Sequence, residues 1–326
     1  MRLTPRTRFA PSVSTYLRAL VLVCAGVLLG TSAHAATKCL DDAGDAAQIT
    51  ATRAAVDAAC GCFEFAKSSE YKKCAAGIVK AQADASLLRK ECTGTVKKIY
   101  ANSVCGRKIG SKGPAVPCVA DNSFNGKVTC AIKPAFGCTN SGSNQRDRCF
   151  GTTTCLDAAD TNGDLRIGAP GDSGDCTPAP SSFTDNGDGT ITDASTGLMW
   201  EKLSDDESIH DRNYGYTWAD AAAVKVAALN GAGGFAGHTD WRVPTMLELL
   251  TLVRTNLSPS IDAAFNTGCA PGCTVLTCSC TGPVYWSSDV PTDPGNAWSV
   301  YYDGNVVYPP QDKDFILFVR AVRGGS

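Results

Sequence analysis

Cysteine is the residue in this sequence most able to carry chemistry. The 326 residues include 17 cysteines but only three histidines, of which His210 and His238 lie after residue 35. A thiolate can act as a nucleophile, bind a metal ion or exchange disulfides. The shortage of histidine disfavours a His-rich metal site, and a Ser-His-Asp triad in the first half of the chain. The cysteines are therefore the first candidates for a nucleophile, for metal ligands or for disulfides.

The redox compartment is indicated by residues 1 to 35, which have the pattern of a secretory signal. Four arginines precede an apolar run over residues 19 to 30, and Ala33-His34-Ala35 is a small-x-small cleavage site. The run is too short to cross a bilayer comfortably, so we expect no membrane span after cleavage. The mature chain is expected to be secreted, periplasmic or held at the cell surface, where disulfides persist.

Cleavage would remove Cys24 and leave sixteen cysteines, which we expect to form disulfides. They fall into a set of twelve and a set of four, and both numbers are even, which predicts two separately stapled regions. Each native bridge typically adds about 2 to 4 kcal/mol of stability. The predicted disulfide residues are Cys39, Cys60, Cys62, Cys74, Cys92, Cys105, Cys118, Cys130, Cys138, Cys149, Cys155 and Cys176, and Cys269, Cys273, Cys278 and Cys280.

The set of four lies within a long loop over residues 257 to 282. Four cysteines so close together could hold zinc as thiolates, but two bridges that pin the loop are favoured because the compartment is oxidising. Binding residues are often placed on long ordered loops of rigid scaffolds. This loop is therefore the first candidate for contact with a ligand or partner.

Composition divides the mature chain into three regions. Residues 36–105 are rich in Ala, Lys and acids, which predicts helices over 46–59, 70–88 and 90–100. Residues 106–180 read as a loop-rich subdomain with a strand over 128–133 and a closing linker. Residues 181–326 carry 8 Lys and Arg against 17 Asp and Glu, which disfavours nucleic acids and sulfated polysaccharides as partners.

The clearest local signal is the stretch from Trp241 to Leu250. Pro244 keeps the preceding residue extended, and Thr245 with Glu248 forms a capping box that starts a helix. Met246, Leu249, Leu250 and Val253 recur at helical spacing, so this helix belongs to the core. Arg242 and Arg320 lie in apolar sequence and are expected to pair with a carboxylate, for which Glu248 is a candidate; anion binding is the alternative.

Four ordered blocks give the chain a family resemblance over about residues 181–324. They are Asp185-Asn186-Gly187-Asp188-Gly189-Thr190-Ile191-Thr192-Asp193 with Thr196-Gly197-Leu198-Met199-Trp200, Trp241-Arg242-Val243-Pro244-Thr245, Tyr285-Trp286-Ser287-Ser288, and Phe318-Val319-Arg320-Ala321-Val322-Arg323-Gly324. They resemble the DUF1566 family, also called the Lcl C-terminal domain. The resemblance implies an α+β, C-type-lectin-like fold on secreted or surface bacterial proteins. We expect a single mixed or antiparallel sheet with two helices, in which residues 315–322 form a central strand.

The resemblance implies a binding or adhesion module, and aromatic residues near polar ones suggest where a sugar would stack. These ligand-binding candidates are Trp298, Tyr301, Asp303, Asn305 and Tyr308. Asp185, Asp188 and Asp193 could hold calcium, although turn chemistry alone explains them. The Glu-Pro-Asn and Trp-Asn-Asp motifs of true C-type lectins and any collagen tract are absent from the sequence. Apart from calcium, we expect no cofactor.

Three function classes follow. The favoured one is a binding or adhesion module of the cell envelope that recognises an extracellular glycan or protein without catalysis. The first alternative is a structural or protein-interaction role, and a homo-oligomer stays open. The less favoured alternative is an enzyme, because formylglycine-generating enzymes share the implied fold; their chemistry needs a free thiol pair or metal ligands in a cleft.

Overall fold

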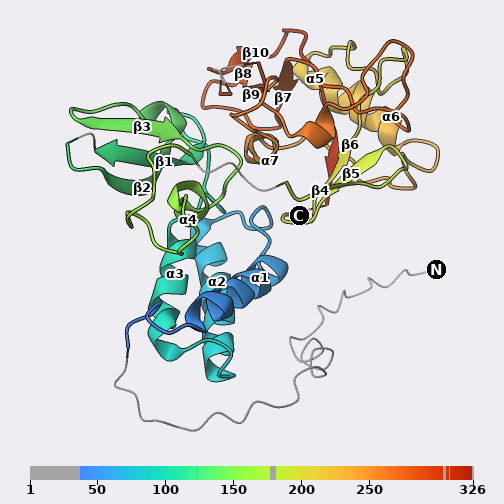
Figure 1. The fold of residues 1–326 in the computed structure, drawn as a ribbon. Coiled ribbons are helices and arrows are strands. Elements are labelled where there is room, and N and C mark those ends of the chain that lie inside the picture. The colour runs from blue at the N-terminus through green and yellow to red at the C-terminus, as the bar shows by residue number, and fades with distance from the viewer. Residues whose placement is uncertain (1–36, 123, 177–180, 304–305, 308, 325–326) are drawn as a thin grey trace, which may run out of the picture. The chain divides into compact units, whose positions relative to one another are not determined.

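A computed structural model of the chain describes residues 37–122, 124–176, 181–303, 306–307 and 309–324 (Figure 1). The expected signal peptide lies outside these residues. Among the residues described, no helix is both long enough and apolar enough to cross a membrane. The region boundaries at residues 105 and 180 stay predictions.

The first region is helical, as its composition indicates. Helices α1 (Asp45–Ala59), α2 (Ser68–Asp84) and α3 (Thr93–Ala101), the last preceded by the short η2 (Lys90–Cys92), follow one another along the chain (Figure 1). Each buries one apolar stripe at helical spacing, as Ile49 and Val56 do on α1 and Tyr71 and Val79 on α2. Disulfides Cys39–Cys92, Cys60–Cys74 and Cys62–Cys105 staple these helices and the turns between them.

The second region holds more regular structure than its sequence suggests. Strands β1 (Ala115–Asn122), β2 (Lys127–Pro134) and β3 (Asn144–Arg148) form an antiparallel sheet in the order β2-β1-β3, followed by α4 (Cys155–Ala159). Only β2 was expected. Pro117 and the all-polar sequence of β3 conceal the other two strands. Disulfides Cys118–Cys138, Cys130–Cys155 and Cys149–Cys176 link this sheet to α4 and the loops around it.

The C-terminal segment is built on short antiparallel strands. The largest sheet has the order β11-β6-β5-β4 and contains β4 (Phe183–Asp185), β5 (Thr190–Asp193), β6 (Met199–Glu201) and β11 (Val322–Arg323). Two-stranded sheets join β7 (Val284–Trp286) to β9 (Ser299–Tyr301), and β8 (Asn296–Ala297) to β10 (Gln311–Asp312). The expectation of an α+β fold is confirmed, but the single sheet is wrong, because these strands divide into three.

The ribbon over residues 315–322 connects these small sheets. Leu317 pairs with Tyr216, Phe318 with Tyr285, and Val322 with both Trp200 and Arg242. Regular strand structure is confined to β11 at its end, so the central strand expected over residues 315–322 is wrong in extent. The second half of this ribbon is nevertheless buried. Its first half is not, since Phe315 and Ile316 are 53% and 63% exposed.

Two short helical segments pack against these strands. The first runs through α5 (Trp218–Asp220), the π-helical stretch η4 (Ala221–Val226) and α6 (Ala227–Asn230); the second is α7 (Met246–Thr251). The capping box at the start of α7 is confirmed, with Thr245 accepting from the Glu248 N–H and Glu248 from the Thr245 N–H. Met246 and Leu249 are fully buried. The core also contains Trp200, Tyr285 and Trp298.

Candidate functional site

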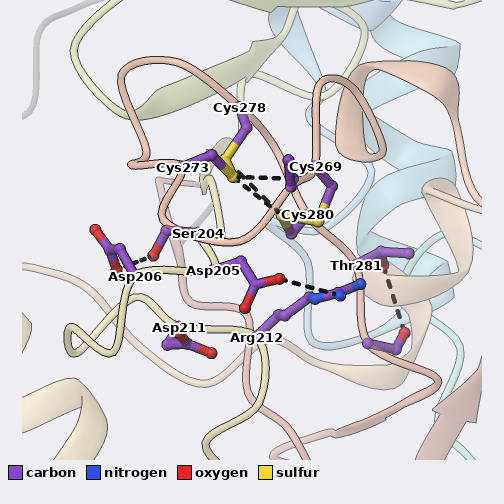
Figure 2. The surroundings of a disulfide bond; sticks show 12 residues. Ser204, Asp205, Asp206, Asp211, Arg212, Cys269, Cys273, Cys278, Cys280 and Thr281 are labelled. Atoms are coloured by element: carbon purple, nitrogen blue, oxygen red, sulfur yellow. Dashed lines mark hydrogen bonds and ion pairs between the residues drawn. A yellow bond between two sulfur atoms is a disulfide. The ribbon is translucent and has the colours of Figure 1, made fainter.

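Two adjacent disulfides pin the loop after α7. Cys269 pairs with Cys280 and Cys273 with Cys278, so the four cysteines form the two bridges expected from the sequence. Figure 2 shows the four sulfurs packed into one cluster. Two disulfides thus cross-link residues 267–281, which we call the cysteine loop.

The cysteine loop is also held by backbone hydrogen bonds. The N–H of Cys280 donates to the Leu203 carbonyl at 2.7 Å, and the N–H of Asp205 donates to the Cys273 carbonyl at 3.0 Å. Gly272 donates in turn to the Asp205 carbonyl at 2.6 Å, and Thr267 and Ser279 pair across the base of the loop. The loop is therefore fixed to the segment that follows β6.

That segment, residues 203–213, carries a cluster of acidic groups whose oxygens are already engaged. Asp205 accepts from Arg212 at 3.2 Å and from the Asn213 side chain at 2.8 Å. Asp206 accepts from the hydroxyl of Ser204 (Figure 2). Burial alone would raise the pKa of Asp206, but hydrogen bonds from Ser208 and Ser204 lower it below its ordinary value. These hydrogen bonds hold the turn in shape.

Two further loops reach the tip of the cysteine loop. A Cβ built on Gly189, in the turn between β4 and β5, would lie 2.8 Å from Cγ2 of Val275 and 2.9 Å from Cζ of Phe235. Gly189 has a φ of +93°, which a glycine adopts without strain. The turn over 185–189, the glycine-rich loop over 231–238 and the cysteine loop therefore meet. Gly189 is buried at this junction, and we call the surface made by Phe235, Val275 and the adjacent Leu276 the three-loop face.

The three-loop face combines apolar side chains with acidic neighbours. Leu276 is 62% exposed at the tip of the cysteine loop, whereas Phe235 is half-buried and packs on Trp241 at a ring distance of 5.3 Å. Asp185 and Asp188 flank Gly189 on the turn. Burial alone would raise the pKa of Asp185, but the hydrogen bond and the positive charge of Lys202 lower it below its ordinary value. The face thus offers a hydrophobic contact beside fixed negative charge.

A buried ionic network lies behind this face. Glu201 of β6 is fully buried, and its Oε1 lies 2.5 Å from Lys225 Nζ and 2.7 Å from His210 Nδ1. Its Oε2 accepts from the Ala321 N–H at 3.0 Å. Burial alone would raise the pKa of Glu201, but Lys225 and His210 lower it to about 2. His210 also stacks on Phe235 at 4.3 Å, which connects the network to the three-loop face.

The expected arginine pairs are only half right. Arg242 binds Glu248 with both terminal nitrogens, at 2.6 and 2.8 Å, as predicted. Arg320 is fully buried but donates to the carbonyl oxygens of Glu201 and Cys280, and it stacks on Phe265 and Tyr285. Carbonyl and aromatic partners replace the expected carboxylate because three chain segments converge around its guanidinium. Both arginines are committed to holding the fold.

Three of the five expected sugar-binding residues, Trp298, Tyr301 and Asp303, lie among the described residues. Trp298 is only 1% exposed and belongs to the core, so its ring is not presented to solvent and its place in the predicted site is wrong. Strand alternation placed it on one face of the sheet but could not say which face is covered. Tyr301 is half-buried and Asp303 exposed. Asn305 and Tyr308 lie outside the described residues.

The three aspartates proposed for calcium are engaged with protein donors. Asp185 accepts from Lys202 and Gly187, Asp188 from Thr190, and the buried Asp193 from Ser182, Ser195 and Thr196. Within the described residues these three carboxylates do not gather into a cluster with metal-ligand spacing. Turn and hydroxyl hydrogen bonds account for their positions, and calcium binding stays an untested prediction.

The segment after residue 181 is thus an α+β domain with short antiparallel strands, two short helices and long loops that meet on one face. The model of the Lcl C-terminal domain family matches residues 189–323, so this segment is similar to that family. A comparison with curated proteins finds none that matches the chain. The sequence could not have located the three-loop face, because Gly189, Phe235 and Val275 lie 46 and 40 residues apart along the chain.

Proposed function

We propose that the chain is a binding module of the cell envelope or the extracellular space, that it performs no catalysis, and that its ligand contacts the three-loop face. The observation that carries this proposal is the exposed Leu276 on a loop fixed by two disulfides and by backbone hydrogen bonds. A loop held in this way loses little entropy on binding, which favours affinity. Similarity to the Lcl C-terminal domain family supports an extracellular module.

The chemistry of the face favours a protein ligand. An exposed leucine beside half-buried valine and phenylalanine gives an apolar contact, and the carboxylate of Asp188 favours basic groups at its rim. A sulfated glycan would meet a segment with 8 basic against 17 acidic residues. The proposed ligand is therefore an extracellular protein surface with apolar and basic side chains.

The absence of catalysis is part of this proposal, and the state of the reactive groups supports it. Both oxygens of Glu201 are occupied by Lys225, His210 and a backbone N–H, which is the arrangement of a structural ion pair. The sixteen described cysteines are all paired in disulfides. A thiol nucleophile would have to be released from one of these bridges first.

The direct test compares ligand classes with the full oxidised chain. The labelled protein is applied to an array of neutral and sulfated glycans and, in parallel, to immobilised outer-surface proteins from envelope preparations. We expect saturable binding to protein, weakened by salt, and none to sulfated glycans. Retention on a sulfated glycan that Leu276→Asp leaves unchanged would overturn the proposal.

A further inference from the structure

The cysteine loop brings four sulfurs closer together than two independent disulfides require. Cys273 Sγ lies 3.6 Å from Cys280 Sγ, and Cys278 Sγ lies 3.8 Å from Cys280 Sγ, although neither pair is bonded. The ligating atoms of Cys269, Cys273 and Cys280 all lie within 4.8 Å of one another. Within the described chain, no other three cysteines gather in this way.

These separations suit a tetrahedral metal centre. Zinc bonds to thiolate sulfur at about 2.3 Å, so the sulfurs at the corners of a tetrahedral zinc site are about 3.8 Å apart. Two of the four unbonded separations, at 3.6 and 3.8 Å, are close to this value. The two bonded pairs would have to open by about 1.7 Å each.

Backbone hydrogen bonds hold the loop in addition to its two disulfides. Backbone hydrogen bonds from Cys280 to Leu203, between Asp205 and Cys273, and across Thr267 and Ser279 hold both ends of the loop. Arg320, buried in the core, donates to the Cys280 carbonyl at 2.6 Å. These contacts involve no sulfur, so they would keep the four cysteines together after reduction.

We propose that the cysteine loop is a redox-gated zinc site, in which Cys269, Cys273, Cys278 and Cys280 bind one Zn²⁺ when both of its disulfides are reduced. Two equivalents of a dithiol reductant convert the two disulfides into four thiols and leave as two disulfides. Zinc then binds the four sulfurs as thiolates and releases four protons. In the reverse exchange, two equivalents of the oxidised, disulfide form of the reductant re-form the two bridges and leave as two dithiols, with uptake of four protons and release of the ion.

The surroundings provide access and partial charge compensation. Cys269 and Cys273 are half-buried, so a reductant and the metal can enter from their side, whereas Cys278 and Cys280 are buried. The Ala270 N–H points at Cys273 Sγ from 3.5 Å, and a backbone N–H to sulfur favours the thiolate. The guanidinium of Arg320 near Cys280 offsets part of the negative charge of four thiolates.

The test uses cobalt as a spectroscopic substitute for zinc in the full chain. The protein is reduced with a thiol-free phosphine under anaerobic conditions and titrated with Co²⁺. We expect one tightly bound Co²⁺ per chain with the sulfur charge-transfer and visible bands of a tetrahedral four-thiolate site, displaced by one equivalent of Zn²⁺. The oxidised protein should show no such bands.

Two double variants with equal numbers of cysteines separate this site from the other thiols that reduction exposes. Cys273→Ser/Cys278→Ser removes two of the four ligands and should abolish the four-thiolate bands, whereas Cys118→Ser/Cys138→Ser removes a bridge elsewhere and should retain them. All five tryptophans lie after residue 181, so their emission reports the folding of this domain alone. Unaltered bands in the first variant, or tryptophan emission typical of an unfolded domain after reduction, would overturn the proposal.

Discussion

Arg242 and Glu248 join the extended chain before α7 to the first turn of that helix. The two guanidinium nitrogens lie 2.6 and 2.8 Å from the two carboxylate oxygens, and Glu248 Oε2 also accepts from the Thr245 N–H at 2.7 Å. Arg242 further donates to the Gly324 carbonyl near the end of the chain. The buried Glu248 carboxylate therefore caps α7 and holds Arg242 in the chain before it. Arg242 in turn holds the backbone at Gly324.

The first prediction concerns this carboxylate. Glu248→Gln should lower the free energy of unfolding by about 2 kcal/mol, because the amide cannot accept both guanidinium bonds and cap the helix as well. Urea unfolding followed by tryptophan emission measures the change. Glu207→Gln, at an exposed position, is the control and should alter stability by less than about 0.5 kcal/mol. Equal effects of the two substitutions would contradict this role of Glu248.

The second prediction is the pH dependence that Glu201 confers. Lys225 and His210 lower its pKa in the folded protein from 4.5 to about 2, so the unfolded state binds the proton first as the pH falls. The stability that Glu201 contributes is complete above about pH 4.5 and is lost progressively towards pH 2. The free energy of unfolding of the natural protein should therefore fall more steeply across this window than that of Glu201→Gln. Parallel curves for the two proteins would show that Glu201 is not held ionised.

The third prediction tests the contact between the loops of the three-loop face. Gly189 and Gly187 both have positive φ, but only a Cβ on Gly189 would meet Val275 and Phe235; a Cβ on Gly187 has nothing within 4 Å. Gly187→Ala should cost about 1 kcal/mol through backbone strain. Gly189→Ala should cost roughly 1 to 3 kcal/mol more, because the methyl group overpacks the junction. Thermal unfolding of both variants checks the difference, and equal losses would mean that the loops do not touch there.

The fourth prediction compares two disulfides by the length of chain that each closes. Cys39 and Cys92 are 53 residues apart and Cys273 and Cys278 only 5. From loop entropy, the longer bridge contributes about 4 kcal/mol and the shorter about 2 kcal/mol. Replacing each pair with serine should therefore cost the helical region, followed by circular dichroism, about twice what it costs the C-terminal domain, followed by tryptophan emission. The reverse order would rule out loop closure as the main contribution of these bridges.

Local signals in the sequence were sufficient for the elements that depend on neighbours in the chain. The capping box of Thr245 and Glu248, the buried positions Leu249 and Leu250 and the helices α1 and α2 are all set by contacts within a few residues. The even division of the cysteines correctly separated the last four from the first twelve, since no disulfide joins the two sets. It did not show that the first twelve divide again into two sets of six, one in the helical region and one in the region of β1 to β3.

The features that sequence reasoning missed depend on contacts between distant segments. Trp298 was expected at a ligand-binding surface, and only the packing of the core shows that it is buried. Lys225 looks like the polar face of an alanine-rich helix, yet its ammonium reaches Glu201 across 24 residues. The three-loop face needs the turn at Gly189, Phe235 and Val275 to meet, which no local pattern encodes.

The most direct test of the proposed binding role compares two exposed leucines in the full oxidised chain. Leu276 is 62% exposed on the three-loop face, and Leu87 is 58% exposed in the helical region. Binding to outer-surface protein should weaken at least tenfold in Leu276→Asp and stay within twofold of the natural chain in Leu87→Asp, since a buried leucine contact is worth about 1.5 to 3 kcal/mol. Equal affinity of the two variants, with both folded, would contradict the account.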